Sequence, residues 1–384
     1  MPRVRPPALG SSTPRWRPPP RRRDGGRLLA AAMAAAASTP RWRRLRARVT
    51  VSAAMPSDPS APADDSSLFP PFDGPGEFDR IRADLPAFRP AVLEVCRRHG
   101  LSTGGLAAFA HGTNVVVSND AGQIIKLFPP FLRHQFEAER LSLARFHGNV
   151  PVATPELLHE AELDGWPYLV MARLPGRPLE EVWPAMSDPE RIDALARIGE
   201  IMRAAHALPT EGLGSIDLGW DTFLERQITG CEARHRRMGL PGHLVSQIPS
   251  YLESARPLLP RSVVPVVLTG EYTPENLLVT RTGERWSVTG MIDFADACLG
   301  PREYDLLGPW LFLAAGSAEL QRAFLCSYGY RITELTPALR RTLMALALLH
   351  RYSNLRFQLR IDGWESQVSS LEELEQTIWP LSPR

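Results

Sequence analysis

The sequence predicts an α+β architecture, in which a small lobe of antiparallel strands precedes a larger helical lobe. Between residues 106 and 172, short apolar runs alternate with hairpin-turn signals such as Asn119-Asp120-Ala121-Gly122 and Asp164-Gly165. Beyond Leu174-Pro175-Gly176, apolar residues recur mainly at helical spacing. A chain of 384 residues is also long enough for two lobes around a cleft.

The first lobe is expected to span residues 73–173. It opens with a helix over residues 78–99, because Phe78, Ile81, Leu85 and Phe88 recur every three or four positions. A second helix is expected at residues 133–146, after the third strand. The strands are expected at 106–110, 115–118, 124–128, 157–162 and 168–172.

The second lobe is expected to span residues 174–382, with the hinge at 171–176. The amphipathic pattern around Ile192, Leu195 and Ile198 is typical of a helix with one buried face. Strands are expected at 263–268, 277–279 and 287–293. Helices are expected at 191–207, 220–237, 241–259, 309–313, 317–328, 336–356 and 370–379.

Charge is distributed unevenly along the chain. Residues 1–54 carry 13 Arg and the single acid Asp24, so the remainder has 31 basic and 41 acidic residues, a net charge of −10. We interpret 1–54 as a disordered Arg/Pro/Ala-rich leader, or as the product of a misassigned start site, and 55–72 as a linker. An organelle transit peptide and a nucleic-acid-binding arm stay open as alternatives. We infer no nucleic-acid partner from the leader.

Several classes of protein are excluded by composition. Four cysteines without a C-x-x-C pair give neither a zinc cluster nor a disulfide framework. No apolar run reaches the roughly 18 residues that a membrane span needs. We therefore expect no membrane partner and a cytoplasmic location; the sequence leaves the oligomeric state open.

Lys126 is the only lysine, beside 43 arginines. It lies near the end of the apolar strand Gln123–Phe128, and lysine offers a compact point charge where arginine offers a planar fork. This predicts contact with phosphate oxygens. The turn Gly112-Thr113-Asn114 lies between two strands, where backbone N–H groups can approach a phosphate. In the following helix Glu137 and Glu139 lie on different faces, so only one of them can orient Lys126.

A polar loop joins two apolar strands between Thr269 and Asn276, and a second polar segment follows Ile292. Asn276 and Asp293 flank neighbouring strands, where their oxygens can converge on Mg²⁺. Glu271, five residues before Asn276, would then accept the proton of a substrate hydroxyl.

These motifs resemble the aminoglycoside phosphotransferases, which have a protein-kinase-like bilobal fold; the closest likeness is to hygromycin B kinases. The family's catalytic loop reads His-Gly-Asp-x-x-x-x-Asn, and the corresponding segment here is Thr269–Asn276. Its metal motif corresponds to Ile292-Asp293-Phe294. The resemblance covers about residues 75–380, including Asp305 as a structural acid.

The resemblance implies a phosphotransferase that uses ATP or GTP with Mg²⁺. Lys126 would bind the α- and β-phosphates and Glu139 would orient it. Glu271 would be the catalytic base. The nucleotide-binding set is Lys126, Glu139, Gly112, Thr113, Asn114, Met171 and Arg173, and the metal ligands are Asn276 and Asp293.

The chain departs from the family at two positions, with Glu271 in place of Asp and Thr269 in place of His. The longer acid shifts the carboxylate by about 1.5 Å. A pseudokinase that binds nucleotide without efficient transfer is therefore the alternative function. The acceptor is expected to be a hydroxyl of a small molecule. An aminoglycoside or another polycation would suit the acidic body, in which 362–379 holds five acids and no base. Antibiotic resistance is one activity that the resemblance leaves open.

Overall fold

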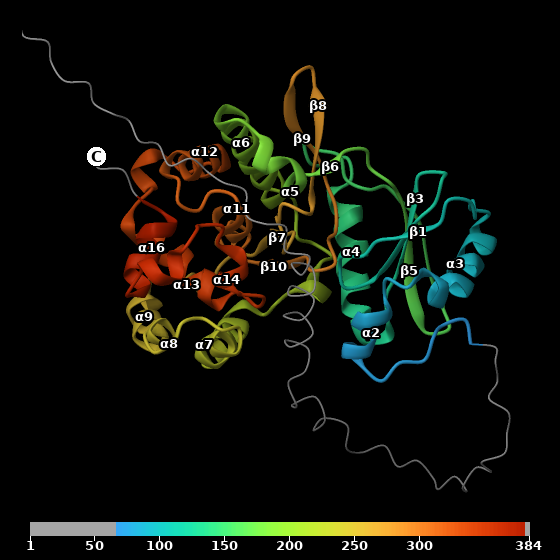
Figure 1. Cartoon of the computed structure of the whole chain (residues 1–384), viewed down its shortest axis with the longest axis horizontal. Helices are drawn as coiled ribbons and strands as arrows, with labels where there is room; N and C mark the ends of the chain where they lie inside the picture. The colour runs from blue at the N-terminus through green and yellow to red at the C-terminus, as the bar shows by residue number, and fades with distance from the viewer. Residues whose placement is uncertain (1–66, 381–384) are drawn as a thin grey trace, which may run out of the picture.

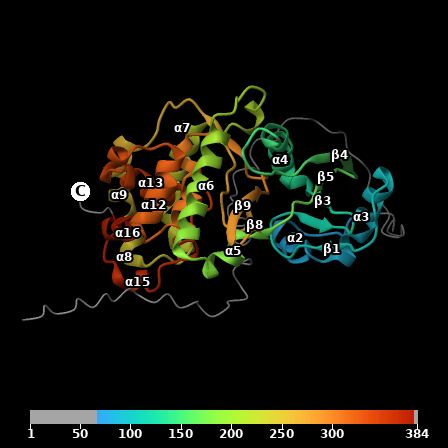
Figure 2. The same cartoon turned by 90° about the horizontal axis from the view of Figure 1, so that it is seen from above.

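The computed structural model describes residues 67–380 (Figure 1). The predicted leader, 1–54, and most of the predicted linker lie outside these residues. Within them the α+β expectation is confirmed. Figure 2 shows the β-rich lobe beside a larger helical lobe, with helix α4 on the side that faces the helical lobe. No helix in residues 67–380 is long and apolar enough to cross a membrane.

The first lobe is built on a five-stranded antiparallel sheet with strand order β1-β2-β3-β5-β4. Helix α4 follows β3 in the chain, as predicted. The elements are α2 (Pro75–Ile81), α3 (Leu85–His99), β1 (Ala107–Ala108), β2 (Val115–Ser118), β3 (Gln123–Leu127), α4 (Arg133–Phe146), β4 (Leu157–Leu163) and β5 (Trp166–Ala172).

The single helix predicted over 78–99 is wrong, because the chain forms α2 and α3 with a break at Arg82–Asp84. Asp84 is extended, and Pro86 lies in the first turn of α3. Proline is tolerated there because the first helical N–H groups have no intrahelical partner. The predicted strand at 106–110 is reduced to Ala107–Ala108.

The second lobe combines two small sheets with a set of helices. Strands β6 (Arg177–Pro178), β8 (Leu277–Thr282) and β9 (Arg285–Met291) form one sheet, and β7 (Val266–Leu268) pairs with β10 (Cys298–Gly300). The helices are α5 (Leu179–Val182), α6 (Asp188–His206), α7 (Trp220–Arg237), α8 (Gly242–Val245), α9 (Ile248–Ala255), α10 (Arg302–Asp305), α11 (Leu307–Phe312), α12 (Ala318–Tyr328), α13 (Pro337–Leu349), α14 (Leu355–Gln358), α15 (Trp364–Gln367) and α16 (Leu371–Ile378).

Two of the predicted long helices are broken. The segment 241–259 forms α8 and α9, with Pro249 in the first turn of α9. The helix predicted over 336–356 ends at Leu349, because side chains of α7 form hydrogen bonds to the carbonyl oxygen of Leu348. Arg234 Nη2 donates to that oxygen at 2.8 Å and His235 Nε2 lies 2.9 Å from it. Residues 350–354 consequently leave the helix.

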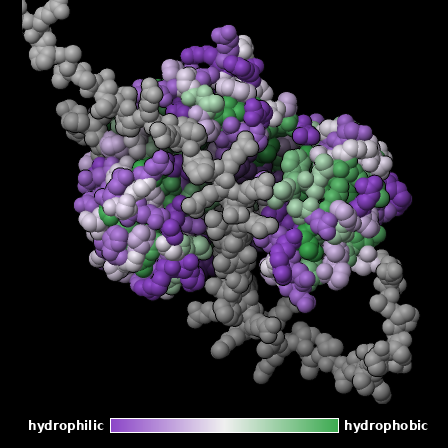
Figure 3. Space-filling view, in the orientation of Figure 1, coloured by the Kyte–Doolittle hydropathy of each residue, from purple (hydrophilic) through white to green (hydrophobic). Residues whose placement is uncertain are grey.

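The two faces of the first sheet pack against different parts of the protein. Ile125 and Leu127 of β3 pack into an apolar core with Phe88 and Val92 of α3. Because successive side chains of a strand point to opposite faces, Lys126 points to the other face, toward α4 and the second lobe. Figure 3 shows that hydrophilic residues cover much of the visible face of the second lobe, whereas the first lobe also carries a hydrophobic area on this face.

Candidate active site

Lys126, the acid predicted to orient it and one of the two predicted metal ligands meet between the two lobes. Lys126 Nζ lies 2.5 Å from Glu139 Oε2 of α4 and 2.9 Å from Asp293 Oδ1, which follows β9. Lys126 and Glu139 are buried, whereas the Asp293 side chain is 34% exposed. Glu137, the other acid of this helix, pairs instead with Arg140 on the surface. The strand–helix geometry therefore selects Glu139.

The three charges set one another's protonation. Burial alone would lower the pKa of Lys126, but Asp293 and Glu139 together raise it above its ordinary value. Burial raises the pKa of Glu139, although Lys126 opposes the shift. Burial would also raise the pKa of Asp293, but the charge of Lys126 has the larger effect and lowers that pKa below its ordinary value. The site thus keeps a positively charged Lys126 between the two carboxylates.

The predicted catalytic loop leaves β7 and is fixed by a buried acid, Asp305. The backbone N–H groups of Thr269 and Gly270 donate to Asp305 at 2.9 and 3.0 Å. Gly270 has φ +80°, and a Cβ on it would lie 2.1 Å from the carbonyl oxygen of Asp296. Only glycine meets both conditions without moving the loop.

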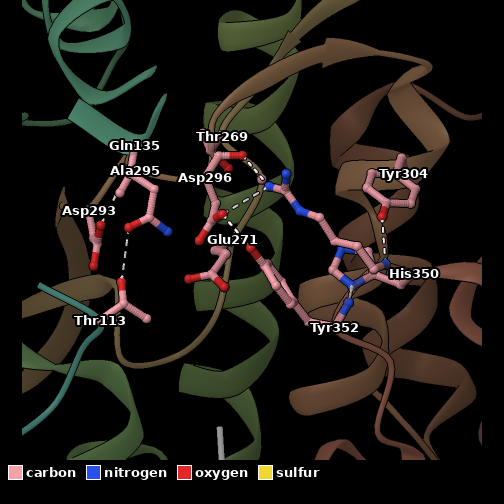
Figure 4. Close-up of polar contacts among 12 residues, drawn as sticks. Thr113, Gln135, Thr269, Glu271, Asp293, Ala295, Asp296, Tyr304, His350 and Tyr352 are labelled. Carbon is pink, nitrogen blue, oxygen red and sulfur yellow. Dashed lines mark hydrogen bonds and ion pairs between the residues drawn. The ribbon is translucent and has the colours of Figure 1, made fainter. Parts of the chain in front are cut away.

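Glu271, the next residue in the loop, lies near several other carboxylates. Burial raises its pKa well above the ordinary value, Asp296 and Asp293 add to the shift, and Arg351 opposes it. Asn276 Nδ2 donates weakly toward the Glu271 backbone oxygen at 3.4 Å and its Oε2 at 3.5 Å. Figure 4 shows Asp293 on one side of Glu271 and Tyr352 on the other.

Asn276 and Asp293 lie at the same end of a strand pair, because Asn276 precedes β8 and Asp293 follows β9. Leu277 of β8 faces Met291 of β9, and Ile292 N donates to Asn276 O at 2.9 Å. Asp293 has φ +63°, a strained conformation for a residue with a side chain, and such strain clusters at functional sites.

The donor chemistry of this pair fits Mg²⁺. Asn276 uses its nitrogen toward Glu271, so its amide oxygen is available. No group of three or more His, Cys, Asp or Glu side chains that could hold a metal occurs in the described part of the chain. Mg²⁺ is commonly held by one or two protein oxygens together with substrate phosphates, so two protein ligands are sufficient for it.

The glycine turn between β1 and β2 is attached to α4. Gln135 Oε1 accepts from Asn114 Nδ2 at 2.9 Å and from Thr113 Oγ1 at 3.3 Å. Gly112 has φ +104° and is exposed. The side chains of Thr113 and Asn114 therefore hold the turn in place, and the backbone of Gly112 is what remains for a ligand.

The predicted hinge residues lie at the end of β5. Met171 is buried and faces Ile124 of β3. Arg173 is exposed; its N–H donates to Gly122 O at 2.9 Å and its guanidinium lies 5.9 Å from the ring centre of Phe109. Both residues are thus at the junction between the lobes.

Four residues near the loops were missed at the level of sequence. Asp296 accepts from Tyr352 and from Arg351, and His206 Nε2 lies 3.2 Å from Asp305 Oδ2. The spacing of Asp296 from Asp293 was the only local signal. Arg351 and Tyr352 were hidden inside a predicted helix. His206 lies near the end of the predicted helix 191–207 and carries no local signal of its own.

A small cavity of about 30 Å³ opens beside Glu271, and Tyr272, Tyr352, Phe312 and Gln358 contribute to its walls. It has room for about one water molecule.

Comparison with known proteins identifies the family. The model of the phosphotransferase enzyme family matches residues 106–356, which is more than half of the chain. The chain belongs to this phosphotransferase family. Helices α2 and α3 precede the matched segment.

Solved structures of family members have the same fold. The GDP complex of wild-type aminoglycoside 2'-phosphotransferase-IIIa is 18% identical with a TM-score of 0.56, covering 74% of this chain and 96% of that one. A complex of APH(2")-IIIa with GDP and kanamycin is 18% identical with a TM-score of 0.54, covering 74% and 97%. APH(3'')-Id from Streptomyces rimosus is 19% identical with a TM-score of 0.50, covering 68% and 97%. The predicted likeness to the aminoglycoside phosphotransferase fold is confirmed, and the finer likeness to hygromycin B kinases stays a prediction.

Proposed function

We propose that this phosphotransferase is a kinase that transfers the γ-phosphoryl group of ATP or GTP, with Mg²⁺, to a hydroxyl of a small molecule. The observation that carries the proposal is the contact of Lys126 with both Glu139 and Asp293 across the two lobes. A buried ammonium held between two carboxylates, one of them partly exposed, supplies positive charge where phosphate oxygens bind.

Each residue has a role that follows from its position. Lys126 would bind phosphate oxygens while Glu139 holds its ammonium in place. Asn276 and Asp293 would hold the metal ion, which when bound neutralises the charge that develops on the phosphates. The backbone of the Gly112 turn, with Met171 and Arg173 at the junction, would complete the nucleotide site.

Glu271 would accept the proton of the acceptor hydroxyl as the new P–O bond forms. Its raised pKa makes it a better proton acceptor than an ordinary carboxylate, provided that it is ionised when the acceptor binds. Phosphoryl transfer depends mainly on positioning and electrostatics. A glutamate at this position is therefore compatible with turnover, and a nucleotide-binding protein without transfer is the alternative that the experiment below decides.

The acidic segment 362–379 gives little support for a polycationic acceptor, because most of its acids are paired within the protein. Glu365 pairs with Arg356 at 2.6 Å, and Glu375 pairs with Arg341 at 2.7 Å. Glu372 lies 3.6 Å from the same Arg341, and Glu373 accepts from the backbone N–H of Ser369 at the start of α16. Four of the five acids are thus engaged within the protein. The acceptor panel should accordingly include neutral alcohols and sugars as well as aminoglycosides such as kanamycin.

The test uses purified full-length chain, ATP or GTP, Mg²⁺ and this panel, with phosphorylated products detected by mass spectrometry. We expect an acceptor-dependent product from the wild type and none from Lys126→Arg. A matched control is Arg97→Lys, the reverse exchange at an exposed site of the same lobe. Nucleotide binding without a product from any acceptor would support the pseudokinase alternative, and full turnover by Lys126→Arg would overturn the assigned role of Lys126.

A further inference from the structure

The segment that follows α13 brings a guanidinium to the loop that contains Asp293. Arg351 Nη2 donates to the backbone oxygen of Asp296 at 2.5 Å and lies 3.3 Å from its Oδ1. Tyr352 donates its hydroxyl to the same Oδ1 at 2.6 Å. Two consecutive residues thus hold both the carbonyl and the carboxylate of Asp296, which is itself 7% exposed.

Asp296 in turn lies against the predicted catalytic loop. Its carbonyl oxygen is 2.1 Å from the place where a Cβ of Gly270 would be, and Arg351 Nη2 is 3.2 Å from that place. Gly270 immediately precedes Glu271, and Asp296 is three residues after Asp293. The two loops therefore touch at Gly270 and Asp296, and the guanidinium of Arg351 is bonded to Asp296 at this contact.

Arg351 is itself rigidly supported. Its backbone N–H donates to the hydroxyl of Tyr304 at 2.9 Å, and the ring of His350 stacks on Tyr304 with centres 4.6 Å apart. One turn earlier, the carbonyl of Leu348 is held by Arg234 and His235 of α7. The guanidinium thus comes from a fixed helix end, and movement of the loops relative to α13 would break its bonds to Asp296.

Buried ion pairs often contribute little net stability, because desolvation offsets most of the attraction. The pair of Arg351 and Asp296 therefore matters mainly for the position of Asp296, because the planar guanidinium contacts two oxygens of that residue. The pair lies outside the set of phosphate, metal and proton-accepting groups assigned above.

We propose that Arg351 is a positioning residue that sets the spacing between Glu271 and Asp293, acting through Asp296 and supported by the hydroxyl of Tyr352. This inference rests on the proposed function, because the spacing matters only if Glu271 and the metal ligand act on the same transfer. A misplacement of about 1 Å in such a site can cost on the order of a hundredfold in rate.

The proposal predicts a specific kinetic pattern. Arg351→Gln should lower kcat by roughly 10- to 100-fold while leaving the KM for nucleotide unchanged, because Lys126 and the hinge are untouched. Arg351→Lys should recover only part of the loss, since a lysine cannot form the planar contact. Added guanidinium, well below denaturing concentrations, should raise the rate of Arg351→Ala and not that of Glu271→Ala. The matched control is Arg356→Gln, which removes an exposed arginine paired with Glu365.

A second measurement does not depend on activity. Hydrogen exchange of the Gly270 and Glu271 amides should be faster in Arg351→Gln than in the wild type, with Arg356→Gln unchanged. If Arg351→Gln fails to fold, Tyr352→Phe, which lacks only the hydroxyl, takes its place in both assays.

The outcomes separate the two proposals. A wild type without phosphoryl transfer would overturn the proposed function, and the hydrogen exchange would still decide whether Arg351 fixes the loop. An active wild type whose variants at Arg351 and Tyr352 keep kcat and amide protection would overturn the positioning role alone. A loss confined to nucleotide KM would also overturn it.

Discussion

Replacing Lys126 with methionine removes the ammonium and keeps a side chain of similar length. Glu139, which is 2% exposed, then loses the cation that lies 2.5 Å away. Leaving a buried charge without its partner typically costs about 3–5 kcal/mol. Asp293 adds little because its side chain is 34% exposed and water can screen it. We therefore expect the free energy of unfolding to fall by about 3 kcal/mol at pH 8.

The loss should depend on pH in a defined direction. Burial raises the pKa of Glu139 even in the presence of Lys126, and the variant should raise it further. The folded variant then binds a proton that the unfolded chain does not, so acidification stabilises it relative to the wild type. The difference in unfolding free energy should shrink by up to about 1.4 kcal/mol per pH unit from pH 8 down to about pH 7, where Glu139 of the folded wild type also takes up its proton.

Urea unfolding of both proteins at pH 8 and pH 6 measures these quantities. The double variant Lys126→Met/Glu139→Gln is the internal control, because it removes the orphaned charge together with its partner and should be more stable than Lys126→Met alone. A loss below about 1 kcal/mol that is the same at both pH values would refute the reasoning, and so would a double variant no more stable than the single one.

Three further changes follow from the structure. Gly270→Ala should reduce kcat strongly and cost about 1–3 kcal/mol of stability, since its Cβ would meet the carbonyl of Asp296 at φ +80°; wild-type turnover would contradict the loop packing. Glu271→Asp should lower kcat by roughly 10- to 100-fold if the site is built around glutamate, and a faster enzyme would show that the longer acid is a misplaced base. Burial lowers the pKa of His235 from 6.5 to about 4. As the pH falls from 6.5 to 4, His235 is therefore protonated only in the unfolded chain. The free energy of unfolding should fall by up to about 1.4 kcal/mol per pH unit over this range. His235→Gln should lose that part of the pH dependence in urea unfolding at pH 7.5 and 5, and an identical slope would reject the assignment.

Local signals were sufficient for much of the site. A lysine retained among 43 arginines and a polar loop between two apolar strands are visible along the chain, and the contact of Lys126 with Asp293 at 2.9 Å agrees with both. The period of two in β3 determines that Lys126 and Ile125 face opposite sides of the sheet. Such patterns predict the α+β class and the proximity of the strands next to Asn276 and Asp293, because they reflect contacts between residues close in sequence; the pairing of Leu277 with Met291 agrees with that proximity.

The tertiary structure decided what depends on contacts between distant segments. The predicted helix continued through His350 and Arg351, yet α13 ends at Leu349. Arg234 and His235, more than a hundred residues earlier, both hydrogen-bond to the carbonyl oxygen of Leu348. The same long-range packing places Arg351 on Asp296, a contact with no counterpart in sequence spacing. The residues alone left Glu137 and Glu139 open, and only the resemblance to the family favoured Glu139. The orientation of α4 on the sheet agrees with that assignment, because Glu139 contacts Lys126 while Glu137 pairs with Arg140. Sequence alone thus determined the chemical groups and their local faces, whereas the folded chain determined which of them meet, because that depends on the packing of whole elements.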